Sequence, residues 1–183
     1  MMADGSGAGL QWTAIAAVAL WVASRGFEYF QEYRRNKRIR SNLVRSLFAE
    51  VDYNTRDFEN FLNNSPDIEI FEDKLVDQNF VPHITDARHT EVYRENISLL
   101  HNIRDTLIQD LISFYGDCEK IGAQIGGVCM PSYKSISVNG QVNVIKTLYE
   151  KCRANKECGE RILIKMQKAY PELKLKRSDD GPS

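Results

Sequence analysis

The polar residues best placed for chemistry are Glu50 and Asn54, which lie one helical turn apart in an otherwise apolar pattern. Val51 and Phe58 flank Asn54, so a helix here would bury its amide and could place the Glu50 carboxylate on the same face. Such a pair could contact a ligand. A single polar position in an apolar helix seam more commonly fixes the register of packing. We favour this structural interpretation of the buried polar pair.

The sequence carries only weak matches to enzyme motifs. The glycines of Gly122-x-x-x-Gly126-Gly127 lack the Lys-Ser/Thr of a phosphate-binding loop, and they follow a predicted helix rather than a strand. Neither G-x-S-x-G nor H-E-x-x-H occurs. Residues 67–74 contain carboxylates and a lysine of the kind found in nucleases, but no sheet is predicted to hold them around a metal. We expect no enzymatic activity, no catalytic residue and no cofactor.

Cysteine and histidine spacing indicates neither a metal site nor a disulfide framework. The cysteines form no C-x-x-C pair, and no histidine lies near them at ligand spacing. In a domain that faces the cytoplasm we expect reduced thiols, whereas the opposite topology would permit two disulfides. The residues concerned are Cys118, Cys129, Cys152, Cys158, His83, His89 and His101.

An uncharged run near the N-terminus predicts where the chain lies. Gly5 to Ser24 carry no charge, and as a helix they would extend roughly 30 Å, the thickness of a bilayer's hydrocarbon core. The tail before this run carries only Asp4, whereas a basic cluster follows it, and basic flanks stay on the cytoplasmic side. We expect one span in a bacterial inner (plasma) membrane, with the N-terminus outside and the C-terminal domain cytoplasmic. A mitochondrial or endoplasmic-reticulum anchor fits the same pattern.

Two other interpretations of this run fit less well. A cleaved signal peptide would begin with basic residues and end at an A-x-A-like site, whereas this tail is acidic and Ala23-Ser24 matches such a site poorly. A helix lying in the membrane interface would need a polar face, which Gln11 and Thr13 alone would have to supply.

The basic cluster is expected to contact anionic lipid headgroups, at about 1 kcal/mol for each cation near the surface. It consists of Arg25, Arg34, Arg35, Lys37, Arg38 and Arg40. From residue 46 on, acidic residues outnumber basic ones, which argues against nucleic acid as a partner.

Small residues recur at helical spacing within the expected span and would let a second helix approach closely in lipid. They are Ala16, Ala19, Ala23 and Gly26. This stripe predicts a homo-oligomer that associates through the membrane helix. Lys37 and Arg40 continue the stripe, so contact between copies would have to end below the membrane unless anionic headgroups screened these charges.

Helical periodicity covers most of the chain. A first helix is predicted from about Leu10 to about Leu62, where Asn63-Asn64-Ser65-Pro66 would end it. A short helix is expected near 70–78. From about Thr90 to Gly126-Gly127 the period indicates one helix, or two that meet near His101.

The last element is ambiguous. Residues 135–144 read SISV-NG-QVNV, which has the alternation and the Asn-Gly pair of a β-hairpin. Helical spacing from Val142 to Tyr170 competes with this pattern, and an isolated hairpin is marginally stable in water. We favour a helix from about Gln141 to Ala169 that ends at Pro171.

These elements predict an all-α chain in which a transmembrane helix continues into a cytoplasmic antiparallel bundle of three to four helices. The expected parts are an extracytoplasmic tail (1–8), the transmembrane helix (9–30), a basic juxtamembrane stalk (31–45), the bundle (46–170) and a disordered tail (171–183).

The expected function is that of a membrane-anchored interaction or scaffold protein, which contacts lipid and an unidentified cytoplasmic protein. The alternative is an oligomerising, membrane-perturbing effector, for example in anti-phage defence or phage lysis, with the bundle sensing a trigger.

Overall fold

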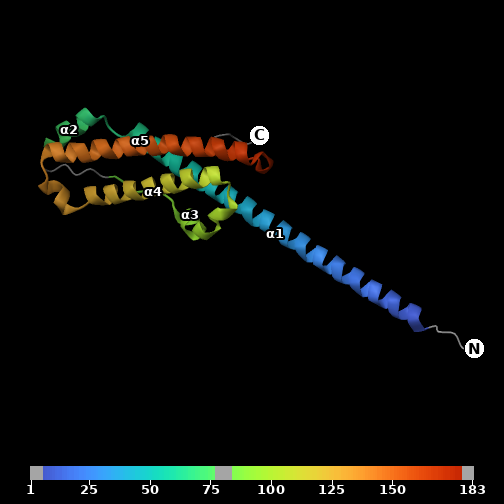
Figure 1. Cartoon of the computed structure of the whole chain (residues 1–183). Coiled ribbons are helices and arrows are strands. Elements are labelled where there is room, and N and C mark those ends of the chain that lie inside the picture. Colours follow the sequence, from blue (N-terminus) through green and yellow to red (C-terminus); the bar gives the residue numbers. More distant parts are fainter. Residues whose placement is uncertain (1–5, 77–83, 179–183) are drawn as a thin grey trace, which may run out of the picture. The chain divides into compact units, whose positions relative to one another are not determined.

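The computed structural model describes residues 6–76 and 84–178, and all regular elements within these ranges are helical (Figure 1). Side chains are described from Leu20 onward, apart from Ala23 and Val76. The all-α prediction is confirmed. The α-helices are α1 (Ser6–Asn64), α2 (Ile68–Val76), α3 (Glu91–Glu95), α4 (Asp105–Val128) and α5 (Val138–Ala169), and the 3-10 helices are η1 (Ile97–Asn102), η2 (Pro131–Ser135) and η3 (Pro171–Leu173).

Helix α1 is continuous, as its periodicity predicts. It ends at the predicted signal, where the Ser65 amide donates to the carbonyl of Phe61 at 3.0 Å just before Pro66. The chain forms two compact units, Met1–Asn42 and Leu43–Ser183, and α1 contributes to both. The second unit begins with the buried side chains of Leu43 and Val44, whereas the expected boundary of the bundle is residue 46.

The second unit is a bundle built around residues 43–64 of α1, together with α4 and α5 (Figure 1). Its main core takes one apolar stripe from each of these helices, because residues three and four apart share a helix face. The fully buried large side chains of the bundle include Leu47, Leu107, Leu111, Phe114, Tyr115, Ile121, Leu148, Ile162, Leu163 and Met166.

The helix directions differ in part from a simple antiparallel bundle. Helices α4 and α5 are antiparallel, and residues 43–64 of α1 are antiparallel to α5 but run in the same direction as α4 (Figure 1). The reason is the long connection between α1 and α4. Its residues 84–104 return the chain along the bundle through α3 and η1, so α4 starts near the N-terminal end of residues 43–64.

The region that could have been a hairpin is the start of α5. The side chain of Ser137 caps this helix and accepts a hydrogen bond from the Gly140 amide at 3.2 Å. Val142 and Ile145, three residues apart, are buried in a second, smaller core against Phe71 and Leu75 of α2. Helical burial therefore outweighs the local turn signal of Asn-Gly, and the favoured helix is confirmed.

Within the described part of the chain, no helix is both long enough and apolar enough to cross a membrane. The transmembrane helix expected at 9–30 is therefore not supported by the structure.

Helices α1 and α5 approach each other closely at Gly159. A Cβ atom at this position would lie 2.1 Å from Thr55 Oγ1 and 3.0 Å from a ring carbon of Phe114. Thr55 cannot move away easily, because its hydroxyl donates to the Val51 carbonyl at 2.7 Å and its side chain is fully buried. Glycine is therefore required here by packing.

We predict that Gly159→Ala destabilises the bundle by about 1–3 kcal/mol, the usual range for overpacking a core. Gly116→Ala is the matched control, because nothing lies within 4 Å of the Cβ it would add to α4. Alanine has the higher helix propensity, so the control should be neutral or stabilising by up to about 1 kcal/mol. Urea unfolding of the full chain in mild detergent measures both, and equal effects would contradict the packing argument.

Candidate functional site

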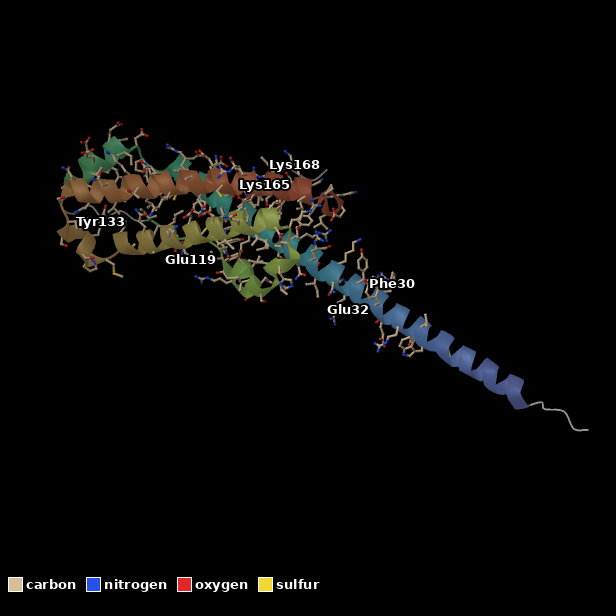
Figure 2. The ribbon with its side chains drawn as sticks, viewed as in Figure 1. Phe30, Glu32, Glu119, Tyr133, Lys165 and Lys168 are labelled. Atoms are coloured by element: carbon tan, nitrogen blue, oxygen red, sulfur yellow. The ribbon has the colours of Figure 1, made fainter. Side chains whose placement is uncertain are left out.

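Residues 21–40 of α1, here called the basic–aromatic segment, are exposed at every described side chain. Figure 2 shows Phe30 and Glu32 leaving the helix on different sides. Large aromatic side chains are normally buried at least in part. A run of exposed rings is therefore typical of a surface that contacts a membrane or another molecule. The exposed rings are Trp21 (63%), Phe27 (62%), Tyr29 (75%), Phe30 (55%) and Tyr33 (59%).

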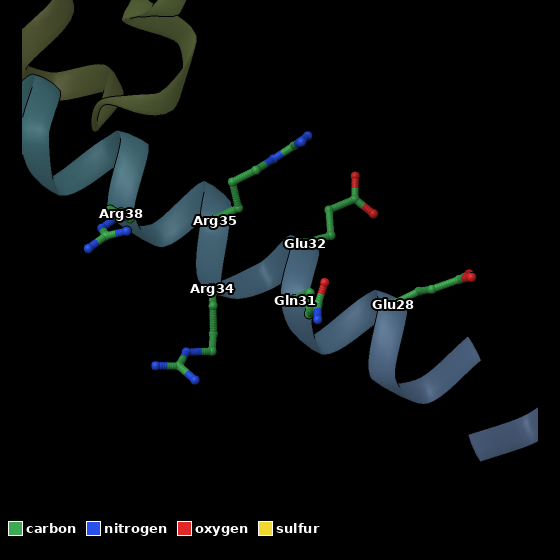
Figure 3. Close-up of a pocket in the computed structure, with 6 residues that line it drawn as sticks. All are labelled: Glu28, Gln31, Glu32, Arg34, Arg35 and Arg38. Carbon is green, nitrogen blue, oxygen red and sulfur yellow. The ribbon is translucent and has the colours of Figure 1, made fainter. Parts of the chain in front are cut away.

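The cations of this segment surround the helix instead of forming one face. Arg34 and Arg35 are successive residues and therefore project about 100° apart. Figure 3 shows them pointing to different sides of the helix, with Arg35 near Glu32. Lys37 and Arg40 lie one turn apart and take a further direction. Helices that lie flat in a membrane interface concentrate their charge on one face, and this segment does not.

Contacts within the segment are weak. Arg25 pairs with Glu28 at 3.2 Å and lies 6.0 Å from the centre of the Trp21 ring, and Arg34 lies 5.7 Å from the ring of Phe30. Exposed ion pairs contribute little to stability because water competes for both charges. The guanidinium groups of Arg25 and Arg34 therefore remain accessible to an external anion.

The stripe of small residues lies in the N-terminal half of α1. Ala16, Ala19 and Ala23 belong to α1, but their side chains lie outside the described residues. At Gly26 no atom lies within 4 Å of the position that a Cβ would occupy. Association of copies through this stripe stays a prediction.

The predicted polar pair, Glu50 and Asn54, fastens the returning chain to α1. The Glu50 carboxylate accepts hydrogen bonds from the backbone amides of Val92 at 2.7 Å and Tyr93 at 3.0 Å. Asn54 donates to the His89 carbonyl at 2.6 Å and accepts from the His89 amide at 2.8 Å. Both side chains are buried, Asn54 completely. We call this arrangement the polar clamp.

A tyrosine from α4 completes the polar clamp. The Tyr115 hydroxyl donates to the Glu50 carboxylate at 2.7 Å, and its ring stacks on that of Tyr93 with the centres 4.1 Å apart. Burial and, to a smaller extent, the neighbouring carboxylate raise the pKa of Tyr115 far above its ordinary value of 10. This tyrosine stays protonated and acts as a donor. The carboxylate oxygens of Glu50 are thus occupied by donors from the chain itself, as a structural role requires.

Asp52, which the sequence analysis did not single out, holds the C-terminal segment. It is 2% exposed and accepts hydrogen bonds from the Arg177 guanidinium at 3.1 Å and from the amide and hydroxyl of Ser178, each at 3.0 Å. Leu175 packs against the main core. Disorder was expected for 171–183, and residues 171–178 are instead ordered on the bundle. Leu173 and Leu175 are the apolar residues in this segment that could have indicated its packing on the bundle.

Arg88 explains the first glycine of the Gly122-x-x-x-Gly126 pattern. The guanidinium donates to the Cys118 carbonyl at 2.8 Å and to Glu119 at 3.1 Å, and it lies against Gly122 so closely that a Cβ would be 1.8 Å from its central carbon. Figure 2 shows Glu119 on α4. The glycine therefore serves packing against Arg88.

A groove of about 510 Å³ lies at the end of α1, between α2, residues 84–87 and α5. Asp57 lines it, and its carboxylate forms no hydrogen bond or ion pair with any other described residue. Burial raises the pKa of Asp57 above its ordinary value of 3.8, the charge of Asp86 raises it further and that of His89 opposes the rise. We call this the Asp57 groove, and its apolar lining residues are Phe61, Phe71, Ile84 and Tyr149.

The two buried cysteines lack the features of a reactive site. All four are free, and burial raises the pKa values of Cys118 and Cys152 to about 12 each, so neither forms a nucleophilic thiolate at neutral pH. Among the residues described, no three His, Cys, Asp or Glu side chains come together in a way that could hold a metal ion.

We predict that Glu50→Ala lowers the free energy of unfolding by about 3 kcal/mol, because one buried and two part-buried donors lose their acceptor. Tyr115→Phe should lose about 1–2 kcal/mol, and the double variant should lose less than the sum because both substitutions break one shared bond. Glu157→Ala, an exposed position on α5, is the control and should stay within about 0.5 kcal/mol. A more stable Glu50→Ala chain would instead indicate a pair kept for ligand binding.

We also predict that Asp57→Asn stabilises the full chain at pH 7. A raised pKa means that the folded state holds the proton more tightly than the unfolded state, so Asp57 favours folding below pH 3.8 and loses this contribution as the pH rises through its folded pKa. Removing the charge should therefore help at pH 7 and have little effect near pH 4. Urea midpoints at both values test this, with exposed Glu157→Gln as the charge-matched control. Destabilisation at pH 7 would show that the carboxylate has a partner.

No family model matches the chain, and neither a curated protein nor a solved structure matches it.

Proposed function

We propose that this chain is a membrane-anchored adaptor, which α1 fixes to an anionic membrane and whose bundle binds a cytoplasmic protein. The observation that carries the proposal is the basic–aromatic segment, in which exposed rings are followed by a dense group of cations along a helix that the described chain leaves uncovered.

The chemistry of the segment fits the headgroup layer of a membrane. Tryptophan and tyrosine favour this layer because one part of each ring system is apolar and the other forms hydrogen bonds. Arginine and lysine place their apolar stems along the lipid while the charge reaches the phosphates. Each cation near an anionic surface contributes about 1 kcal/mol, so Arg25, Arg34, Arg35, Lys37, Arg38 and Arg40 together would give strong attraction.

The direction of the helix follows from the same residues. Cations and rings surround the basic–aromatic segment. If the helix passes through the headgroup layer, the side chains on all sides of it can contact lipid, whereas only one side could do so if the helix lay flat on the membrane. The uncharged run from Gly5 to Ser24 would then enter the hydrocarbon. The basic flank favours a cytoplasmic bundle, and the free cysteines agree with a reducing compartment.

A role in binding rather than catalysis is supported by the polar groups of the bundle. Glu50, Asp52 and Asn54 are hydrogen-bonded within the chain, so they stabilise the fold and are not available to a substrate. The surface of the bundle is acidic overall, since acidic residues outnumber basic ones from residue 46 on. Such a surface suits a basic partner and would be repelled from the anionic membrane itself.

Intrinsic fluorescence tests the membrane contact, because the only two tryptophans, Trp12 and Trp21, both lie in the N-terminal region. In a Trp12→Phe chain we predict that vesicles of brominated phosphatidylglycerol quench Trp21 and shift its emission to the blue. Replacing Arg34, Arg35 and Arg38 by glutamine should reduce the quenching, and where binding is reversible the lipid affinity should fall about a hundredfold, at roughly 1 kcal/mol per cation.

The matched control replaces three exposed cations of the bundle, Lys134, Lys146 and Arg153, and should leave the quenching unchanged. Alkaline carbonate then separates an inserted helix, which stays with the vesicles, from one bound only to the surface. Trp21 emission that brominated vesicles do not alter would contradict the proposal.

A further inference from the structure

The Asp57 groove combines three features that together favour a ligand site. Its carboxylate is half-buried, it has no hydrogen bond or ion pair within the described chain, and it faces a volume of about 510 Å³. A carboxylate that is partly removed from water and left unpaired is less favourable than a fully solvated one, and burial accordingly raises its pKa. A polar group that reduces stability in this way is typical of a site that a partner completes.

We propose that the Asp57 groove is the docking site for a lysine or arginine side chain carried by an apolar segment of the protein partner. The inference rests on the proposed function, in which the bundle binds a protein, and it assigns the position of that contact and the chemistry of the occupant.

The lining of the groove suits the stem and the charge of a basic side chain. Phe61 and Tyr149 meet edge to face with ring centres 5.3 Å apart, and the Tyr149 hydroxyl donates to the Pro66 carbonyl at 3.3 Å, which holds the ring in place. Aromatic faces attract cations and also pack against methylene groups. Asp57 would supply the opposite charge at one side of the groove.

The surroundings of the groove add charge complementarity. Helix α2 contributes the buried ring of Phe71 to the lining and exposes Glu69, Glu72 and Asp73, while Asp67 follows the lining residue Pro66. Carboxylates around an apolar groove steer a basic segment toward it and disfavour an acidic one. An apolar segment with one central cation would therefore match both the apolar lining of the groove and the carboxylates around it.

The test uses the full chain in neutral detergent without lipid, at physiological salt. Two short fluorescent leucine peptides, one with a single central lysine and one with a single central glutamate, serve as probes, and anisotropy reports binding. We expect the lysine peptide to bind saturably and the glutamate peptide not to bind. Asp57→Asn should weaken binding about tenfold, as expected for loss of a half-buried charge partner. Glu157→Gln removes one charge from an exposed site on α5 and should change binding less than twofold.

The Asp57→Asn chain should also be more stable at pH 7, so its lost binding could not come from unfolding. Three results would each overturn the assignment. They are unchanged binding of the lysine peptide by Asp57→Asn, equal binding of both peptides, and binding of free spermidine as tight as that of the lysine peptide, which would show that leucine contributes nothing. Self-association that the lysine peptide cannot displace would assign the groove to a second copy instead. Peptide binding is measured without lipid, and Trp21 quenching is measured without peptide. The groove assignment and the proposed membrane contact can therefore fail independently.

Discussion

The buried carboxylate of Glu50 is the constraint on which the rest of the bundle depends. It places a negative charge inside the core, where it is tolerated only because two backbone amides and one phenol donate to it. Those donors come from α3 and α4, so satisfying a single charge on α1 fixes the position of both. With α3 held against α1, the returning chain must run the length of the bundle before α4 begins, which makes α1 and α4 parallel.

Three acidic residues of α1 show how one helix can use the same functional group in three ways. Glu50 is saturated by donors and determines the topology. Asp52, two residues on, meets the C-terminal segment and holds Arg177 and Ser178 on the surface of the bundle. Asp57 has no such partner within the described chain and faces the Asp57 groove. The first two stabilise the fold, and the third reduces stability in a way that a basic ligand would reverse.

The basic–aromatic segment presents a contrast with the bundle. In the bundle, aromatic side chains such as Phe114 and Tyr115 are almost completely buried and each meets a neighbouring ring. In the basic–aromatic segment, rings of similar size stay exposed between cations. The two units of the chain thus bury apolar surface differently, one within itself and the other, as we propose, against lipid.

The sequence by itself determined the elements. Apolar residues at helical spacing predicted α1, α4 and α5, Pro66 and Pro171 predicted where two of them end, and the burial of Asn54 followed from its place between Val51 and Phe58. These signals are local, because hydrogen bonding and amphipathicity of a helix depend on neighbours within one or two turns. Helix α5 was the difficult case, since Asn139-Gly140 gave a hairpin signal that only burial of Val142 and Ile145 outweighed.

Only the tertiary structure decided how these elements meet. The partners of the Glu50 carboxylate lie more than 40 positions away in the chain. Asp52 has a local partner in Arg56, but its contacts with Arg177 and Ser178 join residues more than 120 positions apart, and the local sequence does not predict them. The parallel course of α1 and α4, the ordered residues 171–178 and the requirement for glycine at 159 arise in the same way. Each depends on contacts between segments distant in sequence, which residue spacing within one helix does not encode.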